Sequence, residues 1–436
     1  MKKIGKYPLD SSAIIYMALL QDGISNVFRL SANLQDAIKP EILQKTVNNI
    51  TPRFPTMVAG ISSGVMEYFA VSVETPPKVK QEIKALLYMP KKEIKKCAIR
   101  ILYKENMIAV EFFHAITDGR GASIFFKSLI AEYIRLAYGV ACSDKDGIIL
   151  PNSPINEEEL SDSFIEYRGK KRQPYFHSSS YRFKRVKKRS EVSVVTGIYD
   201  TRSILRKAHE YGVTLTAFLS AVMLESVMEL QLRMKKPRQR TKPVHLMVPI
   251  DLRGQFPSET LRNFALQAYL SLYPNDVDVP FENLINSVKG QLQRQFDVDP
   301  LSAIITETAR LQHDLQFVPI LIKTWATRFV LNFVEENTSA LFFSNLGVLK
   351  LPNQLKPYVK GVDFVLTPRI SSPYNCGVIS LEDRLHINLT KCGEGAGLER
   401  LFFEKLHRHG CIPDMLVDGK PISMAEFLGW SNLFKE

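Results

Sequence analysis

The alternation of apolar and polar residues along the first third of the chain predicts a mixture of strands and helices. Apolar residues recur every second position in a half-buried strand and every third or fourth position in an amphipathic helix. Residues 98–114 join two apolar runs through Lys104-Glu105-Asn106, a pattern typical of a hairpin. Pro40 suits the first turn of a helix, and an apolar face follows it. The predicted elements are strands at 25–34, 56–61, 66–73 and 98–114, and helices at 40–49 and 121–138.

The same alternation of element types begins again near residue 192. An apolar stretch at 317–334 is interrupted by Lys323 and Arg328, and we interpret it as packing against the core, with contact to lipid or to an acyl chain as the alternative. The predicted elements are strands at 192–199, 244–252, 264–273, 339–345, 362–368, 376–380 and 384–390, and helices from 201, at 214–233, at 281–297 and at 397–408.

The segment between these two regions has a different composition. Residues 141–190 are rich in Ser, Pro, Asp, Lys and Arg, as is typical of a long crossover or linker. We therefore predict a mixed α/β fold with mostly antiparallel strands in two halves, residues 1–175 and 191–436. Strict β-α-β alternation, a GxGxxG sequence and a Walker A sequence are all missing, which argues against nucleotide hydrolysis and dinucleotide redox chemistry.

One segment combines a strand end, a short loop and a helix start with chemically useful side chains. In IAVEFFHAITDGRG, His114 ends the strand, and Asp118 and Gly119 follow in the loop. A histidine in a cleft can act as a general base because its pKa lies near neutral pH. A glycine at 119 or 121 would permit backbone angles that a bulkier residue resists. By its residues alone, His114 could equally be an ordinary partly buried histidine at a strand end.

The wider sequence favours the catalytic interpretation. HAITDGRG resembles the HxxxDG motif of the chloramphenicol acetyltransferase-like superfamily, which includes condensation domains and alcohol acetyltransferases. The opening blocks YPLDSSAIIYMALL, VFRLSANL and TPRFPTM, and the later blocks VPIDLRGQFPSETLRNF and FFSNLG, are similar to blocks of bacterial alcohol acetyltransferase-type proteins. The resemblance implies two similar subdomains arranged in a V, with the active-site channel between them.

The resemblance also implies residue roles. His114 would take the proton from an acceptor hydroxyl or amine, which then attacks a thioester. Asp118 would hold the loop by pairing with Arg253, although Arg253 could also be a surface residue that ends a strand. Ser344 and Asn345 are candidate oxyanion or channel residues, with a structural turn as the alternative. Phe113 stands where condensation domains carry a second histidine, and the DFGWG block of plant members is missing, so simple acyl transfer is favoured over peptide condensation.

Charge and cysteine content narrow the expected partners. The formal net charge of +12 is concentrated in KKEIKK, RFKRVKKR and RMKKPRQRTK, which are either solvated loops or a surface for an anionic partner. The five cysteines have no CxxC spacing, so we expect reduced thiols in a cytoplasmic protein and no metal site. Cys97 lies in a lysine run that could lower its pKa, but it has no adjacent catalytic motif.

These observations together predict an acyl-CoA-dependent O-acyltransferase whose acceptor is an alcohol or an amine. Acyl-CoA would be a co-substrate, and no bound cofactor is expected. The alternatives are a donor carried by an acyl carrier protein, as in lipid, polyketide or peptide assembly, and a catalytically silent binding relative. We expect a monomer that has no transmembrane segment and does not bind nucleic acid, because no apolar run reaches the length of a span and no nucleic-acid-binding signature accompanies the basic runs.

Overall fold

The fold is described from a computed structural model of the chain. It describes residues 5–20, 26–84, 86, 88–169, 179–183, 192–234, 237–276, 279–368, 372–393, 397–418 and 420–422. Much of the predicted linker, at 170–178 and 184–191, lies outside the described residues, as does most of the basic run RFKRVKKR.

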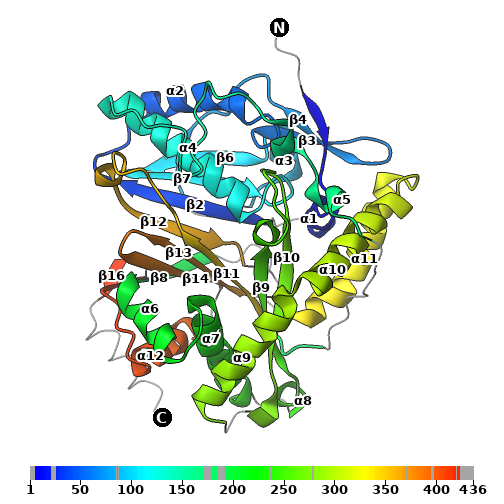
Figure 1. Cartoon of the computed structure of the whole chain (residues 1–436), viewed down its shortest axis with the longest axis vertical. Helices are drawn as coiled ribbons and strands as arrows, with labels where there is room; N and C mark the ends of the chain where they lie inside the picture. The colour runs from blue at the N-terminus through cyan, green and yellow to red at the C-terminus, as the bar shows by residue number, and fades with distance from the viewer. Residues whose placement is uncertain are drawn as a thin grey trace.

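A five-stranded sheet with the strand order β12-β2-β7-β6-β5 forms the upper part of the molecule in Figure 1. The hairpin β6–β7 is antiparallel, and β2 pairs with β7 from Val27 opposite Phe113. A small three-stranded sheet, β1-β4-β3, lies beside it. These strands are β1 (Lys6–Pro8), β2 (Val27–Leu34), β3 (Ala59–Ser63), β4 (Tyr68–Ser72), β5 (Lys80–Gln81), β6 (Ile99–Lys104), β7 (Met107–Phe113) and β12 (Val359–Leu366).

An eight-stranded sheet with the order β10-β9-β11-β13-β14-β8-β15-β16 forms the lower part. Most of its pairs are antiparallel, but β11 runs parallel to both β9 and β13. Its strands are β8 (Val192–Asp200), β9 (Val244–Asp251), β10 (Ala265–Leu272), β11 (Leu341–Val348), β13 (Tyr374–Leu381), β14 (Arg384–Cys392), β15 (Met415–Asp418) and β16 (Lys420–Ile422).

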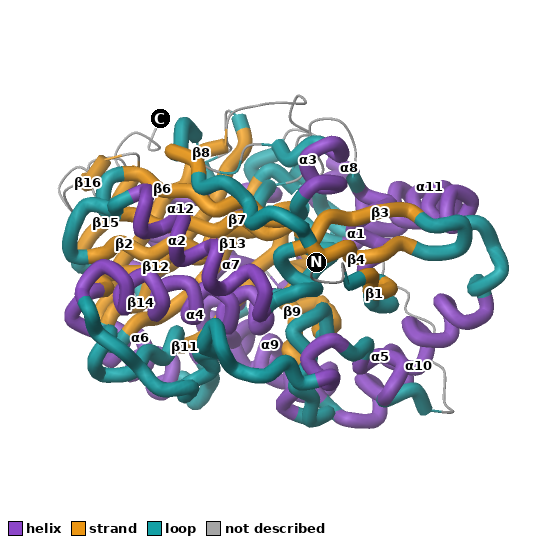
Figure 2. Tube along the Cα trace, turned by 90° about the horizontal axis from the view of Figure 1, so that it is seen from above, coloured by secondary structure: helices purple, strands orange, loops and turns teal. Residues whose placement is uncertain are grey.

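Helices cover the outer faces of these sheets, and two long helices, α10 and α11, lie at one side of the molecule (Figures 1 and 2). Helix α4 packs with α2 above the upper sheet, and α7 packs with α9 and α12 below the lower one. The helices are α1 (Ala13–Leu19), α2 (Pro40–Ile50), α3 (Lys91–Lys96), α4 (Gly119–Tyr138), α5 (Ser163–Glu166), α6 (Thr201–Glu210), α7 (Leu215–Leu232), α8 (Pro237–Arg240), α9 (Phe281–Phe296), α10 (Val298–Asp314), α11 (Ile320–Thr338) and α12 (Leu398–Arg408).

This architecture confirms the predicted mixed α/β fold with mostly antiparallel strands. Buried apolar residues form two hydrophobic cores, one around each large sheet. Strand β12 leaves the C-terminal part of the chain and pairs with β2, where it contacts β13 and β14 of the other sheet. The first core therefore includes residues from 349–381, and the division of the chain at 175 and 191 stays a prediction.

By length and composition, helix α7 is long and apolar enough to cross a membrane, contrary to the expectation that no apolar run reaches the length of a span. In this helix, 72% of the apolar segment is buried, and its apolar side chains belong to the hydrophobic core of the eight-stranded sheet. Burial on nearly all sides explains a helix that is hydrophobic all round.

Two charged or apolar segments also differ from their predicted structure. The run KKEIKK forms helix α3, where Ile94 is buried among exposed lysines. The stretch 317–334 is largely helix α11, but much of its apolar surface faces outward: Phe317 is 80% exposed and Trp325 is 69% exposed. Packing against the core therefore explains only one side of this helix.

Candidate active site

His114 follows the last residue of β7 and is held by its backbone and by two aromatic rings. Its backbone N–H donates to the carbonyl of Asn26 at 2.8 Å. The imidazole stacks on the Tyr16 ring from α1, with a centroid distance of 4.2 Å and an interplanar angle of 9°. The Phe28 ring from β2 lies edge-on to the imidazole, with a centroid distance of 4.9 Å. These contacts restrict the ring to one plane.

A hydrogen bond to an asparagine then fixes the rotation of the ring in that plane. His114 Nδ1 lies 3.2 Å from Oδ1 of Asn263. Asn263 donates through its backbone N and through Nδ2 to Oδ2 of Asp10, at 3.3 and 3.0 Å. Because Nδ2 is held by the carboxylate, the amide oxygen faces the imidazole and Nδ1 carries the proton. The lone pair of the imidazole is then on Nε2, as a general base requires.

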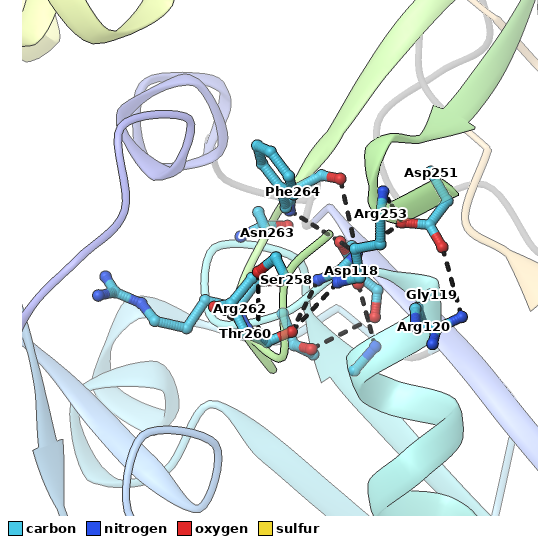
Figure 3. A network of polar contacts seen from close by, with 12 residues as sticks. Asp118, Gly119, Arg120, Asp251, Arg253, Ser258, Thr260, Arg262, Asn263 and Phe264 are labelled. Carbon is cyan, nitrogen blue, oxygen red and sulfur yellow. Dashed lines mark hydrogen bonds and ion pairs between the residues drawn. The ribbon is translucent and has the colours of Figure 1, made fainter. Parts of the chain in front are cut away.

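The loop after His114 is held by a buried ion pair between the two halves of the chain (Figure 3). Asp118 Oδ2 accepts from Arg253 Nη1 at 2.8 Å and from the backbone N of Phe264 at 2.8 Å. Its Oδ1 caps helix α4 by accepting from the backbone N of Gly121 at 3.0 Å. Because all of these hydrogen bonds join Asp118 to other protein groups, the carboxylate stabilises the conformation of the loop.

The guanidinium of Arg253 donates hydrogen bonds to several oxygen atoms at the end of β9 and in the loop that follows it. It donates to the carbonyls of Thr260 and Arg262 at 2.9 and 2.8 Å, and to Oδ1 of Asp251 at 2.8 Å. Burial lowers the pKa of Arg253, but the charges of Asp118 and Asp251 outweigh that effect, so the pKa lies above its ordinary value. Arg253 is 8% exposed, which rules out the alternative of a surface residue.

Of the two glycines at the start of α4, Gly121 is required for space, and neither is required for unusual backbone angles. Gly119 and Gly121 lie in the first turn of α4, and neither has a positive φ. A Cβ at Gly121 would lie 2.2 Å from the carbonyl oxygen of Leu261, which is backbone and cannot move aside easily. A Cβ at Gly119 would meet only the flexible end of Leu346. The prediction of permissive dihedral angles was therefore wrong, because the other half of the chain approaches this turn too closely for a side chain.

Ser344 and Asn345 both line the same cavity as His114, but their side chains are used differently. Asn345 donates to Thr216 Oγ1 at 3.1 Å and accepts from the backbone N of Gly347 at 2.9 Å. These bonds fit the alternative of a structural turn at Asn345. The Ser344 hydroxyl makes no hydrogen bond to another residue that the structure describes, so it is the better of the two candidates for an oxyanion donor.

The cavity beside His114 has a volume of about 170 Å³ and lies between the two large sheets. His114, Asp118 and Gly119 line it from the first half of the chain, and residues of β9, β10 and β11 line it from the second. Within the described ranges, no group of three or more His, Cys, Asp or Glu side chains could hold a metal ion. Burial raises the pKa of the Cys97 thiol to about 11, which is opposite to the direction expected from its neighbouring lysines.

Sequence reasoning missed the three residues that position the His114 ring: Tyr16, Asn263 and Asp10. Each lies inside a block already quoted for its family resemblance, YPLDSSAIIYMALL or SETLRNF. An aromatic or amide residue in such a block is a signal that could have been followed. However, Tyr16 and Asn263 are 98 and 149 positions from His114 in the sequence, and Asp10 acts on His114 only through Asn263.

Comparisons with solved structures identify this arrangement of sheets. Trichothecene 15-O-acetyltransferase TRI3 from Fusarium sporotrichioides aligns with a TM-score of 0.59 at 11% identity, covering 93% of this chain and 94% of that chain. F. graminearum TRI101 complexed with coenzyme A and deoxynivalenol aligns with a TM-score of 0.62 at 11% identity, covering 91% and 96%. The epimerization domain from the third module of tyrocidine synthetase B aligns with a TM-score of 0.55 at 11% identity, covering 93% and 96%.

The chain has the chloramphenicol acetyltransferase-like fold. The predicted resemblance to this superfamily is thereby confirmed at the level of the fold. No protein-family model matches the sequence, and no curated protein matches it significantly.

Proposed function

We propose that the protein transfers an acyl group from coenzyme A to an alcohol, with His114 as the general base. The observation that carries this proposal is the pairing of His114 with Asn263 in a cavity between the two large sheets. It leaves the lone pair of the imidazole on Nε2 and holds the ring by hydrogen bonding and stacking, as proton abstraction requires.

The reaction then needs one proton transfer in each direction. His114 Nε2 takes the proton from the acceptor hydroxyl while the alcohol oxygen attacks the thioester carbonyl. The tetrahedral intermediate collapses, its C–S bond breaks, and the thiolate leaves with the proton that His114 returns. Ser344 is best suited to stabilise the developing oxyanion, because its hydroxyl makes no hydrogen bond to another described residue.

The Asp118–Arg253 pair has a positioning role in this scheme. Asp118 caps α4 directly after the loop that carries His114, and Arg253 ties that cap to the second half of the chain. A shift of about 1 Å in a catalytic group can cost a hundredfold in rate, so a rigid loop supports catalysis without touching the substrate.

The choice of donor and acceptor is supported by charge and by structural similarity. A formal net charge of +12 favours a donor that carries several phosphates. TRI3 is a 15-O-acetyltransferase and TRI101 was solved with coenzyme A, and both share the fold. An acyl carrier protein is the alternative donor, since its acidic surface would meet the same positive charge.

A thiol-release assay with acyl-CoA donors and alcohol acceptors tests the proposal. We expect His114→Ala to lower kcat/KM by a factor of about 10² to 10⁴, the usual contribution of a positioned general base. His313→Ala is the matched control, because this histidine lies on α10 with 57% of its side chain exposed and does not line the cavity. Equal rates for His114→Ala and the wild type would refute the catalytic assignment, and release from carrier-protein thioesters alone would establish the alternative donor.

A further inference from the structure

A second cavity lies next to the catalytic one and is larger. It has a volume of about 300 Å³, and residues of α1, α10, α11 and the start of β10 line much of it. Its lining surface is mainly apolar, with contributions from Ile14, Ile15, Leu266, Ile304, Leu311 and Leu315, and it also includes the carboxylates of Glu67 and Glu307. An engineered apolar cavity of about 150 Å³ in another protein holds benzene, so this one has room for an alkyl chain on the order of ten carbons.

The two cavities share a wall. Tyr16, Ala265, Leu266 and Gln267 line both of them. Tyr16 is also the residue whose ring stacks on His114 at 4.2 Å. The second cavity therefore adjoins the first at the Tyr16 ring, which lies against the imidazole.

Several polar side chains at the edge of the second cavity are already engaged within the protein. Asp10 accepts from Ser12 and Asn263, and Ser11 donates to Asp162 at 2.7 Å. Lys323 donates from Nζ to the carbonyl of Met66 at 2.8 Å. These bonds satisfy Asp10, Ser11 and Lys323 within the protein, so the apolar part of the lining is left to bind a hydrocarbon.

Helix α11 contributes one wall of this cavity, and it lies at the side of the molecule (Figure 1). Ile320, Lys323 and Thr327 face the cavity, whereas Trp325 and Phe329 lie on the outer face and are 69% and 66% exposed. Exposed apolar surface of this kind is typical of sites that bind apolar molecules. An alkyl chain that passes α11 therefore contacts apolar groups outside and inside the helix.

We propose that this second cavity binds the alkyl chain of the substrate, so that the enzyme prefers chains on the order of ten carbons. The inference rests on the proposed acyl transfer and adds the substrate class to it. The chain has two possible chemical sources, the acyl group of the thioester and the hydrocarbon of the alcohol, and both present the same CH₂ surface to the cavity.

Two substrate series distinguish these sources. In one series the acyl-CoA varies from acetyl to decanoyl with a fixed short alcohol, and in the other the alcohol varies from butanol to decanol with acetyl-CoA. Each buried methylene contributes enough to raise kcat/KM about threefold to fourfold, so the decanol-to-butanol ratio should reach at least about a hundred if the alcohol chain is bound. A comparable rise confined to the acyl series would assign the cavity to the donor.

Filling the cavity should remove this gain. Thr308→Trp places a large side chain into the cavity from α10, and Ile304→Phe does so with a smaller increase in volume. Val298→Trp is the matched control, because Val298 lies on the same helix, is 52% exposed and does not line the cavity. We expect both cavity variants to lower the long-to-short ratio at least about tenfold, as loss of contact with two or more methylenes would, and the control to keep it.

Direct binding separates this inference from the proposed reaction. The wild type should enhance the fluorescence of dansylaminoundecanoic acid, and decanol but not butanol should displace the probe. Thr308→Trp should lose this binding while keeping the circular dichroism of the wild type. If His114-dependent thiol release occurs but the ratio stays below about three in both series, the chain-binding inference fails and acyl transfer stands. If the probe binds but no donor releases thiol, the cavity assignment holds and the proposed function fails.

Discussion

Removal of the guanidinium of Arg253 is the sharpest test of how the two halves of the site hold together. The side chains of Arg253 and Asp118 are 3% and 5% exposed, and they are joined at 2.8 Å. Arg253→Met keeps the apolar stem and deletes the charge, so Asp118 keeps only its backbone donors and two loop carbonyls lose theirs. Breaking such a buried pair costs about 3–5 kcal/mol.

Arg120 offers a matched comparison in the same network. It lies 3.8 Å from Asp251, which also accepts from Arg253, but the side chains of Arg120 and Asp251 are 58% and 43% exposed. An exposed ion pair contributes only about 0–1 kcal/mol, because water and salt screen it. Arg120→Met should therefore leave the unfolding free energy nearly unchanged.

The assay is urea unfolding followed by fluorescence and by circular dichroism, so that departures from two-state behaviour are visible. A double-mutant cycle with Asp118→Asn, which preserves a capping side chain, isolates the pairwise interaction. We expect the double variant to cost at least about 1 kcal/mol less than the sum of the single variants. Equal costs for Arg253→Met and Arg120→Met, or strict additivity in the cycle, would refute the argument that this pair joins the halves.

Two further predictions concern Asn263 and Asp162. Asn263→Ala deletes one neutral hydrogen bond to Nδ1, so kcat/KM should fall about threefold to tenfold with an altered pH profile, and an unchanged profile would remove Asn263 from the positioning role. Burial and the nearby charge of Asp10 raise the pKa of Asp162 to about 6. The folded state then holds this proton more tightly than the unfolded state, so the wild type should lose stability relative to Asp162→Asn as the pH rises from about 4 to 7, by at most about 3 kcal/mol. Parallel stability curves for the two proteins across that range would contradict this.

Local pattern was sufficient for most of the secondary structure. Periodicities of two and of three to four residues predicted the hairpin β6–β7, helix α4 and the strands of the second half, because these patterns follow from burying one face of a regular element. Short elements such as β1 and α1 were missed, since a few residues carry no measurable period. The outward aromatic face of α11 was also missed, because apolar content does not say which side of a helix is covered.

The candidate site divides in the same way. His114, Asp118 and Gly119 are close in sequence, and the resemblance to a known family identified their spacing as a motif and added Arg253. Asn263 and Tyr16 became visible only when the fold brought them against the imidazole. No periodicity or motif spacing encodes a contact between residues 149 positions apart.

The sequence by itself thus determined the element types, the fold class and the identity of the candidate base. The tertiary structure decided which nitrogen of His114 holds the proton, why Gly121 must lack a side chain, and where a second cavity adjoins the first. The physical reason is one of range. Backbone propensity and amphipathic period act between neighbours along the chain, whereas hydrogen bonds, steric limits and cavities depend on packing between segments that the sequence keeps far apart.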